Sequence, residues 1–159
     1  MKKTLVAYFS AGGMTEQLAK TLAEAIGADL FEIRPAVPYT EADLNWRDPA
    51  ARSTVEMADP HSRPAIAAGC AHLDAYDTVF VGFPIWWYVA PTIVNTFLES
   101  GDLAGKTVVP FATSGGSGMG QTNEKLRPSC PGATLRTGKV WPIDASRAER
   151  TAWAEKQMR

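Results

Sequence analysis

The sequence predicts an α/β fold in which a parallel sheet is covered by helices on both faces. Three short apolar runs, at residues 5–9, 78–81 and 107–112, have the length and composition of strands buried on both faces. Each run is followed by a loop rich in glycine, hydroxyl or aromatic residues, and then by a segment with helical periodicity. Repetition of strand, loop and helix along one chain is typical of a doubly wound sheet.

The first predicted strand leads through a short loop into a helix over residues 16–26. Apolar residues recur along one face of this helix, and Gly27 closes it. The first loop, residues 10–15, holds only small or hydroxyl-bearing residues apart from one methionine. Its backbone N–H groups can therefore surround an anion at the positive end of the helix dipole. The candidate binding residues of this loop are Ser10, Gly12, Gly13, Met14 and Thr15.

The first loop lacks the lysine that a nucleoside triphosphate would require, so its composition suits a single phosphate monoester. The alternative is that Gly12-Gly13 only makes a tight turn between a strand and a helix. This loop alone does not decide between the two interpretations. Two further loops at equivalent positions favour a ligand.

The second strand is expected at residues 28–33, followed by an irregular excursion over residues 34–74 that contains five prolines. This segment is too long for a simple crossover. We expect it to replace the usual helix between the second and third strands, with a short helix from Asp48-Pro49 through about Met57 and a returning helix near residues 65–72.

Aromatic and charged residues of the excursion could form a lid at the edge of a bound ligand. The alternative, which the sequence favours, is that the excursion covers one face of the sheet and that its aromatic residues anchor it. The residues concerned are Tyr39, Trp46, Arg47, Arg52 and Glu56.

The third strand is followed by the second loop, residues 82–91, which holds three consecutive aromatic residues between prolines. Such side chains offer large flat apolar faces with polar edges, so contact with a flat ligand is favoured. The alternative is that the tryptophans plug the end of the sheet or a dimer interface. Pro91 suits the first position of the helix that follows. The candidate ligand contacts are Pro84, Ile85, Trp86, Trp87 and Tyr88.

The fourth strand is followed by the third loop, residues 113–120, which is rich in glycine. A P-loop is excluded because Gln121 stands where the lysine must be, and the evenly spaced glycines do not fit the dinucleotide fingerprint. A flexible linker is the alternative, but a loop between a strand and a helix favours close approach of backbone to a ligand. The candidate residues are Thr113, Ser114, Gly115, Gly116 and Gly118.

The chain is expected to end with a fifth strand at residues 135–140 and a closing helix from about Arg147. Ser146 and Glu149 form a capping box at the start of this helix, and Trp153 is placed to bury the helix against the sheet.

These three loops, in this order along nearly the whole chain, resemble the flavodoxin family. The resemblance implies a flavodoxin-like three-layer α/β/α sandwich with a five-stranded parallel sheet in the order 2-1-3-4-5. It also implies FMN as cofactor, with the phosphate on the first loop and the isoalloxazine ring between the second and third. Gly12 and Met14 depart from the usual family pattern and remove side-chain donors from the phosphate loop.

The preferred function that follows is an electron-transfer protein in which FMN is the redox centre and no side chain is catalytic. The alternative is an FMN-dependent NAD(P)H:quinone-type oxidoreductase, with a nicotinamide pocket supplied by the excursion through Arg47 or Arg52. A third possibility is a binding module without redox function. The net charge of −1 gives little overall field to steer a partner protein, which argues against a general electron shuttle.

Length and composition agree with this reading. The 159 residues are expected to form one domain, residues 1–159, and 45% of them are hydrophobic. No apolar stretch approaches the length of a membrane span, and the chain enters its first strand directly, so a cytoplasmic location is expected. The expected partners are a redox protein, or NAD(P)H and a small acceptor, and not nucleic acid or a membrane. Either a monomer or a homodimer is compatible with the sequence.

The cysteines and histidines give no sign of a metal site. Cys70 and Cys130 form no C-x-x-C pair and are expected to be free thiols. His61 and His72 are isolated and are expected to have surface or packing roles.

Overall fold

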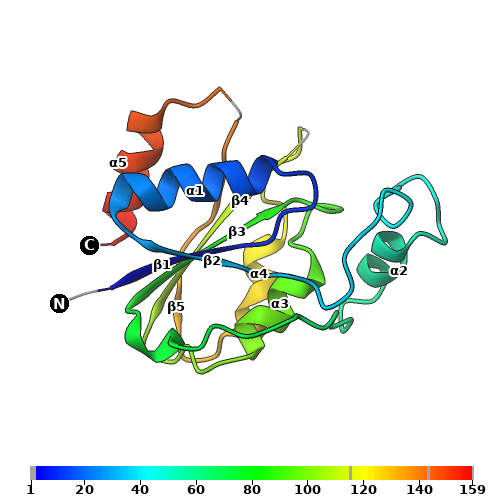
Figure 1. The fold of residues 1–159 in the computed structure, drawn as a ribbon, viewed down its shortest axis with the longest axis horizontal. Helices are drawn as coiled ribbons and strands as arrows, with labels where there is room; N and C mark the ends of the chain where they lie inside the picture. The colour runs from blue at the N-terminus through cyan, green and yellow to red at the C-terminus, as the bar shows by residue number, and fades with distance from the viewer. Residues whose placement is uncertain (1–2, 115, 143, 159) are drawn as a thin grey trace.

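The computed structural model describes residues 3–114, 116–142 and 144–158 of the chain (Figure 1). The strands are β1 (Thr4–Tyr8), β2 (Asp29–Glu32), β3 (Thr78–Pro84), β4 (Thr107–Thr113), β5 (Thr134–Leu135) and β6 (Lys139–Val140). The α-helices are α1 (Met14–Ile26), α2 (Arg52–Ala58), α3 (Thr92–Glu99), α4 (Thr122–Leu126) and α5 (Arg147–Gln157). Two short 3₁₀ helices are η1 (Leu73–Ala75) and η2 (Arg127–Ser129).

All strand pairs are parallel, and the order across the sheet is β2-β1-β3-β4-β5, which confirms the predicted order. Helices α1 and α5 lie on one side of the sheet, and α3 and α4 lie on the other (Figure 1). Neighbouring residues of β3 face opposite layers: Phe80 belongs to the core cluster under α1, whereas Val79 and Val81 belong to the cluster under α3. The central strands are therefore apolar on both faces, as a doubly covered sheet requires.

Strand β3 continues to Pro84, beyond the predicted end at residue 81. The three added residues include Gly82, where a Cβ atom would stand 2.3 Å from the ring of Phe111 on β4. Glycine is therefore required inside this strand so that the Phe111 ring can lie across it.

The predicted fifth strand is divided into β5 and β6, which both pair with β4. After the Arg136 N–H, which donates to the Val108 carbonyl of β4 at 2.9 Å, the backbone bonds to a side chain: Asn123 Nδ2 donates to the Arg136 carbonyl at 2.7 Å, and Gly138 N–H donates to Asn123 Oδ1 at 3.1 Å. The facing part of β4 includes Pro110, which has no N–H group. The continuous strand expected at residues 135–140 is therefore corrected to two short ones.

The helix predicted near residues 65–72 is also wrong. Ile66 lies in an extended segment that forms an antiparallel bridge with Pro35, with Ala67 N–H donating to the Arg34 carbonyl at 2.7 Å. The other short helix of the excursion begins at Arg52, later than predicted, because Asp48 Oδ1 accepts the Ala50 N–H at 2.9 Å and forms a turn.

The C-terminal helix follows the prediction closely. Ser146 Oγ accepts the Glu149 N–H at 3.1 Å and caps α5. Trp153 packs edge-on against Trp141 and Phe80, with ring centroids 5.6 and 5.8 Å away, so it joins the helix to the sheet.

Cys70 and Cys130 are free thiols, and His61 and His72 are exposed. Within the described residues, no group of three or more metal-binding side chains is assembled. None of the helices in the described part of the chain is long and apolar enough to cross a membrane.

Candidate functional site

The three predicted loops meet at the carboxyl edge of the sheet. Thr15 Oγ1 and Thr113 Oγ1, from the first and third loops, lie 2.8 Å apart. Ile85 N–H of the second loop donates to the Thr113 carbonyl of the third at 2.9 Å, and the N–H of Gln121, directly after the third loop, donates to the Tyr88 carbonyl at 3.2 Å. In doubly wound sheets, ligands bind at this edge, where the strand order reverses.

The first loop has the shape of an anion site. Gly13 has φ +90, which only glycine adopts readily, and its N–H donates to Ser10 Oγ at 3.0 Å. The N–H groups of the first turn of α1 have no acceptor within the helix. A Cβ atom added at Gly12 or Gly13 would meet no other atom within 4 Å, so the loop faces open space. These features fit a phosphate monoester.

Charges around the start of α1 are balanced. Tyr8 Oη donates to Glu16 Oε1 at 3.2 Å, and Lys20 Nζ lies 3.7 Å from the same carboxylate. Burial, together with the negative charges of Glu32 and Glu16, raises the pKa of Tyr8 to about 12. Tyr8 therefore stays protonated at neutral pH and continues to donate to Glu16.

The second loop forms a tight turn at Trp87 and Tyr88, whose φ values are +51 and +66. Trp86 and Val89 close the turn with reciprocal backbone hydrogen bonds of 2.9 and 3.2 Å. Aromatic residues seldom occupy the left-handed region, where each costs about 1–3 kcal/mol, and such residues cluster at functional sites. The turn leaves Trp87 43% and Tyr88 66% exposed.

Trp86 points the other way, into the protein. Its ring packs edge-on against Phe9 and Tyr39, each with ring centroids 5.6 Å away. Tyr39 belongs to the excursion, so Trp86 connects the second loop to that segment.

A half-buried ion pair fixes this part of the excursion. Arg52 Nε lies 2.9 Å from Glu56 Oε2, its guanidinium carbon lies 3.8 Å from the centre of the Tyr39 ring, and Nη1 donates to the Val37 carbonyl at 2.7 Å. Tyr39 Oη donates to the other oxygen of Glu56. Burial and this hydrogen bond raise the pKa of Tyr39. Arg52 therefore serves the fold, whereas Arg47 is exposed and stacks on Trp46 at 4.9 Å.

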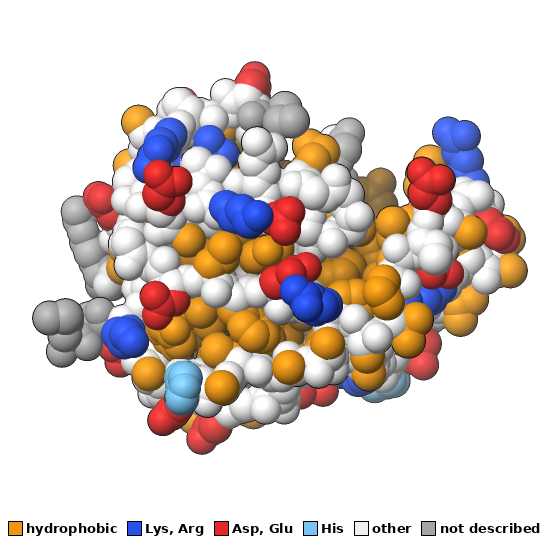
Figure 2. Space-filling view, in the orientation of Figure 1, with side chains coloured by type: hydrophobic (Ala, Val, Ile, Leu, Met, Phe, Trp, Pro, Cys, Tyr) orange, Lys and Arg blue, Asp and Glu red, His pale blue; other side chains and the backbone are white. Residues whose placement is uncertain are grey.

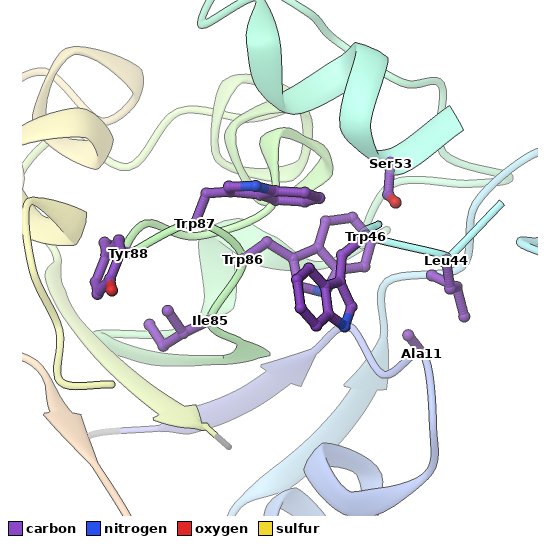
Figure 3. A pocket seen from close by; sticks show the side chains of 8 residues that line it. All are labelled: Ala11, Leu44, Trp46, Ser53, Ile85, Trp86, Trp87 and Tyr88. Atoms are coloured by element: carbon purple, nitrogen blue, oxygen red, sulfur yellow. The ribbon is translucent and has the colours of Figure 1, made fainter. Parts of the chain in front are cut away.

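The excursion around α2 lies beyond the carboxyl ends of the strands and not over a face of the sheet (Figure 1). The favoured interpretation of this part as a cover over the sheet is therefore corrected, and its residues line a cavity instead. The cavity has a volume of about 420 Å³ and is lined by Ala11, Leu44, Trp46, Ser53, Ile85, Trp86, Trp87 and Tyr88 (Figure 3). None of these described residues is charged.

Sequence reasoning missed three of the lining residues, Ala11, Leu44 and Ser53. Ala11 lies within the predicted first loop but has no functional group that would single it out, whereas Leu44 and Ser53 belong to the excursion, which reaches the cavity only through tertiary contacts. Trp46 alone was recognised as a candidate for this wall.

Hydrogen bonds to the Ser114 side chain hold the backbone of the third loop. Ser114 Oγ accepts the N–H groups of Gly116 and Ser117 at 3.2 and 2.8 Å. Thr113, Ser114 and Met14 line a second cavity of about 370 Å³ between α1 and α5, together with Trp141 and Arg150. Of the predicted site residues, those of the second loop from Ile85 to Tyr88 line the first cavity, Met14, Thr113 and Ser114 line the second, and the other described ones line neither of these two cavities. Gly115 lies outside the described residues.

The fold and the site together define a flavodoxin-like domain, a doubly wound sheet whose carboxyl edge carries a phosphate-type loop beside an aromatic cavity. The chain belongs to the flavodoxin family: the family profile described as Flavodoxin matches residues 3–157.

Solved structures agree with this assignment. A candidate flavoprotein from Bacteroides eggerthii is 46% identical, with a TM-score of 0.93, over 100% of this chain and 99% of its own. A candidate flavoprotein from Bacteroides uniformis is 51% identical, with a TM-score of 0.91, over 97% and 98%. A flavoprotein from Lactobacillus acidophilus in complex with FMN shares the fold at 19% identity, with a TM-score of 0.73 and 100% of both chains covered. No curated protein matches the chain.

Proposed function

We propose that the protein binds FMN and transfers electrons through it. The observation that carries the proposal is the meeting of the three loops at the carboxyl edge of β1, β3 and β4, with the first loop at the start of α1. The family and the FMN complex of the Lactobacillus acidophilus protein support it. FMN supplies reversible uptake of one or two electrons.

Each loop has a distinct role in this proposal. The backbone N–H groups of residues 12, 14 and 15 and the hydroxyls of Ser10 and Thr15 hold the phosphate, while the Gly13 N–H orients Ser10 Oγ. Ile85 and the aromatic residues after it border the ring and exclude water from it. Backbone N–H groups near Ser114 to Gly118 meet the polar edge of the ring. No side chain is required as an acid or base.

A second candidate is an FMN-dependent oxidoreductase of the NAD(P)H:quinone type. It is favoured by the excursion residues Leu44, Trp46 and Ser53, which add an uncharged wall to the cavity beside the second loop, where a small molecule can reach the flavin ring. Acidic and basic side chains are interspersed over the face shown in Figure 2, without a large area of one sign. That pattern gives little steering toward a charged partner protein.

The decisive experiment is titration of the apo-protein with FMN, followed by visible absorption and flavin fluorescence. The proposal predicts saturable binding of one FMN per chain. A chain that folds but ignores FMN would instead be a binding module of another kind. Rapid oxidation of NAD(P)H by the FMN-loaded protein would select the oxidoreductase, and its absence would select the carrier. Size-exclusion chromatography of the FMN-loaded protein would decide between a monomer and a homodimer. The cytoplasmic location stays a prediction.

The reduction potential of bound FMN is expected to lie below that of free FMN, by about 30 mV or more for the two-electron couple. Neither the second nor the third loop contains lysine or arginine, and Arg52 is paired with Glu56. The charge of reduced flavin would gain little local stabilisation, and the apolar cavity wall disfavours it. A dye-coupled redox titration measures this potential; a value above that of free FMN contradicts the argument.

The two tryptophans of the second loop are expected to respond differently to alanine. Trp86→Ala should lower the free energy of unfolding by about 2–3 kcal/mol, because its ring holds Phe9 and Tyr39. Trp87→Ala should change stability by less than about 0.5 kcal/mol but weaken FMN binding by roughly tenfold through lost stacking. Urea unfolding and FMN titration separate the two effects. Unchanged FMN affinity in both variants would exclude stacking by either ring.

A further inference from the structure

We propose that the outer half of the aromatic cavity binds a neutral, planar quinone, and that Ser53 Oγ donates a hydrogen bond to a carbonyl oxygen of that quinone. The inference rests on the proposed FMN site and names the class of small molecule that this site accepts. It makes Ser53 a binding residue that no sequence pattern indicated.

The cavity has two differently built sides. Ala11 and Ile85 come from the first and second loops, next to the proposed flavin position. Leu44, Trp46 and Ser53 come from the excursion and form the other part of the wall, with Leu44 drawn beside Ala11 (Figure 3). No described residue of the third loop lines this cavity, although that loop should contact the flavin ring. The outer side therefore offers a surface for a second flat molecule beyond the flavin.

Ser53 carries the evidence for a polar ligand. The residue is only 2% exposed, and its Oγ has no hydrogen-bond partner among the described residues. A buried hydroxyl without a partner costs free energy, and native proteins rarely retain one without a reason. In Figure 3 the hydroxyl points from α2 toward the cavity.

The position of Ser53 is fixed by its surroundings. Its N–H donates to the Asp43 carbonyl at 2.9 Å, and the adjacent Arg52 is held by Glu56 and by the Val37 carbonyl. The hydroxyl is therefore carried on a rigid segment, as a residue that selects a ligand should be.

The chemistry of the walls selects the ligand class. Three tryptophans line the cavity, and none of the described lining residues is charged, so a flat neutral molecule is favoured over an anion. A dinucleotide would need cations for its pyrophosphate, but Arg52 is already paired and Arg47 is exposed outside the lining. A quinone offers both an aromatic plane and a carbonyl acceptor for the Ser53 hydroxyl.

The test uses the full chain loaded with FMN, oxidised and without reductant, and menadione as the probe. Isothermal titration calorimetry should show saturable binding to the wild-type protein. Ser53→Ala should weaken that binding about 3- to 10-fold, the worth of one hydrogen bond. The melting temperature of Ser53→Ala should be equal to or above that of the wild type, because the substitution removes an unpartnered hydroxyl.

The matched control is Thr54→Val. Thr54 carries another buried Oγ1 without a partner, one residue further along α2, but it does not line the cavity. This variant should bind menadione as the wild type does. The inference is overturned if the loaded wild type does not bind menadione, if Ser53→Ala binds it equally well, or if Thr54→Val loses as much affinity. Failure of the chain to load FMN would be seen first, in the absorption spectrum, and would overturn the proposed function together with the inference.

Discussion

Replacement of Gly120 by alanine is expected to lower the free energy of unfolding by about 2–4 kcal/mol and to weaken FMN binding. Gly120 has φ +53, and a Cβ atom there would stand 2.4 Å from the Tyr88 carbonyl oxygen and 2.9 Å from the Tyr88 Cβ. A backbone oxygen cannot rotate away as a flexible side chain can. The same carbonyl accepts the Gln121 N–H at 3.2 Å, so the added methyl must push the second and third loops apart.

Urea unfolding and FMN titration measure the two effects of Gly120→Ala. Gly118→Ala is the matched control, because a Cβ atom at Gly118 meets nothing within 4 Å in the same loop and its φ is not in the left-handed region. Gly118→Ala should leave the free energy of unfolding within about 0.5 kcal/mol of the wild type. Equal stability of the two variants would mean that the Gly120 contact does not hold the loops together.

The close contact at Gly120 also explains why an aromatic residue tolerates the left-handed backbone at Tyr88. The Tyr88 carbonyl accepts a hydrogen bond from the Gln121 N–H. It can take this position because Gly120 has no side chain to collide with it. The strain of the turn is thus balanced by a contact with a different loop. Sequence reasoning singled out both segments but contained no information that one supports the other.

The fold was largely predictable because a parallel sheet covered on both faces leaves a strong local signal. Strands β1, β3 and β4 are apolar runs that the sequence marks plainly, and each ends where a loop of unusual composition begins. The order of the strands came from the family resemblance. The site loops could be found because glycine and aromatic residues at strand ends have few other uses.

The failures have a common physical cause, which is that tertiary contacts decided the local structure. Residues 65–72 form no helix because Ile66 pairs with Pro35, and β5 does not continue into β6 because Asn123 takes the bonds of the Arg136 carbonyl and the Gly138 N–H. Both partners are distant in sequence. The excursion was misplaced for the same reason: Tyr39 finds Phe9 and Trp86 at the sheet edge, and no local pattern records that contact.

The role of the first loop is tested most directly by Gly13→Ala, which is expected to weaken FMN binding about 10- to 100-fold while leaving riboflavin binding unchanged. Alanine at φ +90 costs about 1–2 kcal/mol, and relief of that strain would turn the loop N–H groups away from the phosphate. Loss of a hydrogen bond to a charged group costs about 1.5–3 kcal/mol, which corresponds to this range of affinity. Riboflavin has no phosphate, so its affinity for the protein should be the same in the variant and the wild type.

Gly105→Ala separates strain from binding. Gly105 has φ +81, and a Cβ atom there also meets nothing within 4 Å, but it precedes the amino end of β4, at the opposite edge of the sheet from the loops. Both variants should lose about 1–2 kcal/mol of stability, since both place alanine in the left-handed region. Only Gly13→Ala should lose affinity for FMN, as measured by fluorescence titration at equal fractions of folded protein. If the Gly13 variant lost FMN and riboflavin to the same extent, the first loop would contact the ring rather than the phosphate, and the orientation of the cofactor in the proposed site would have to be reversed.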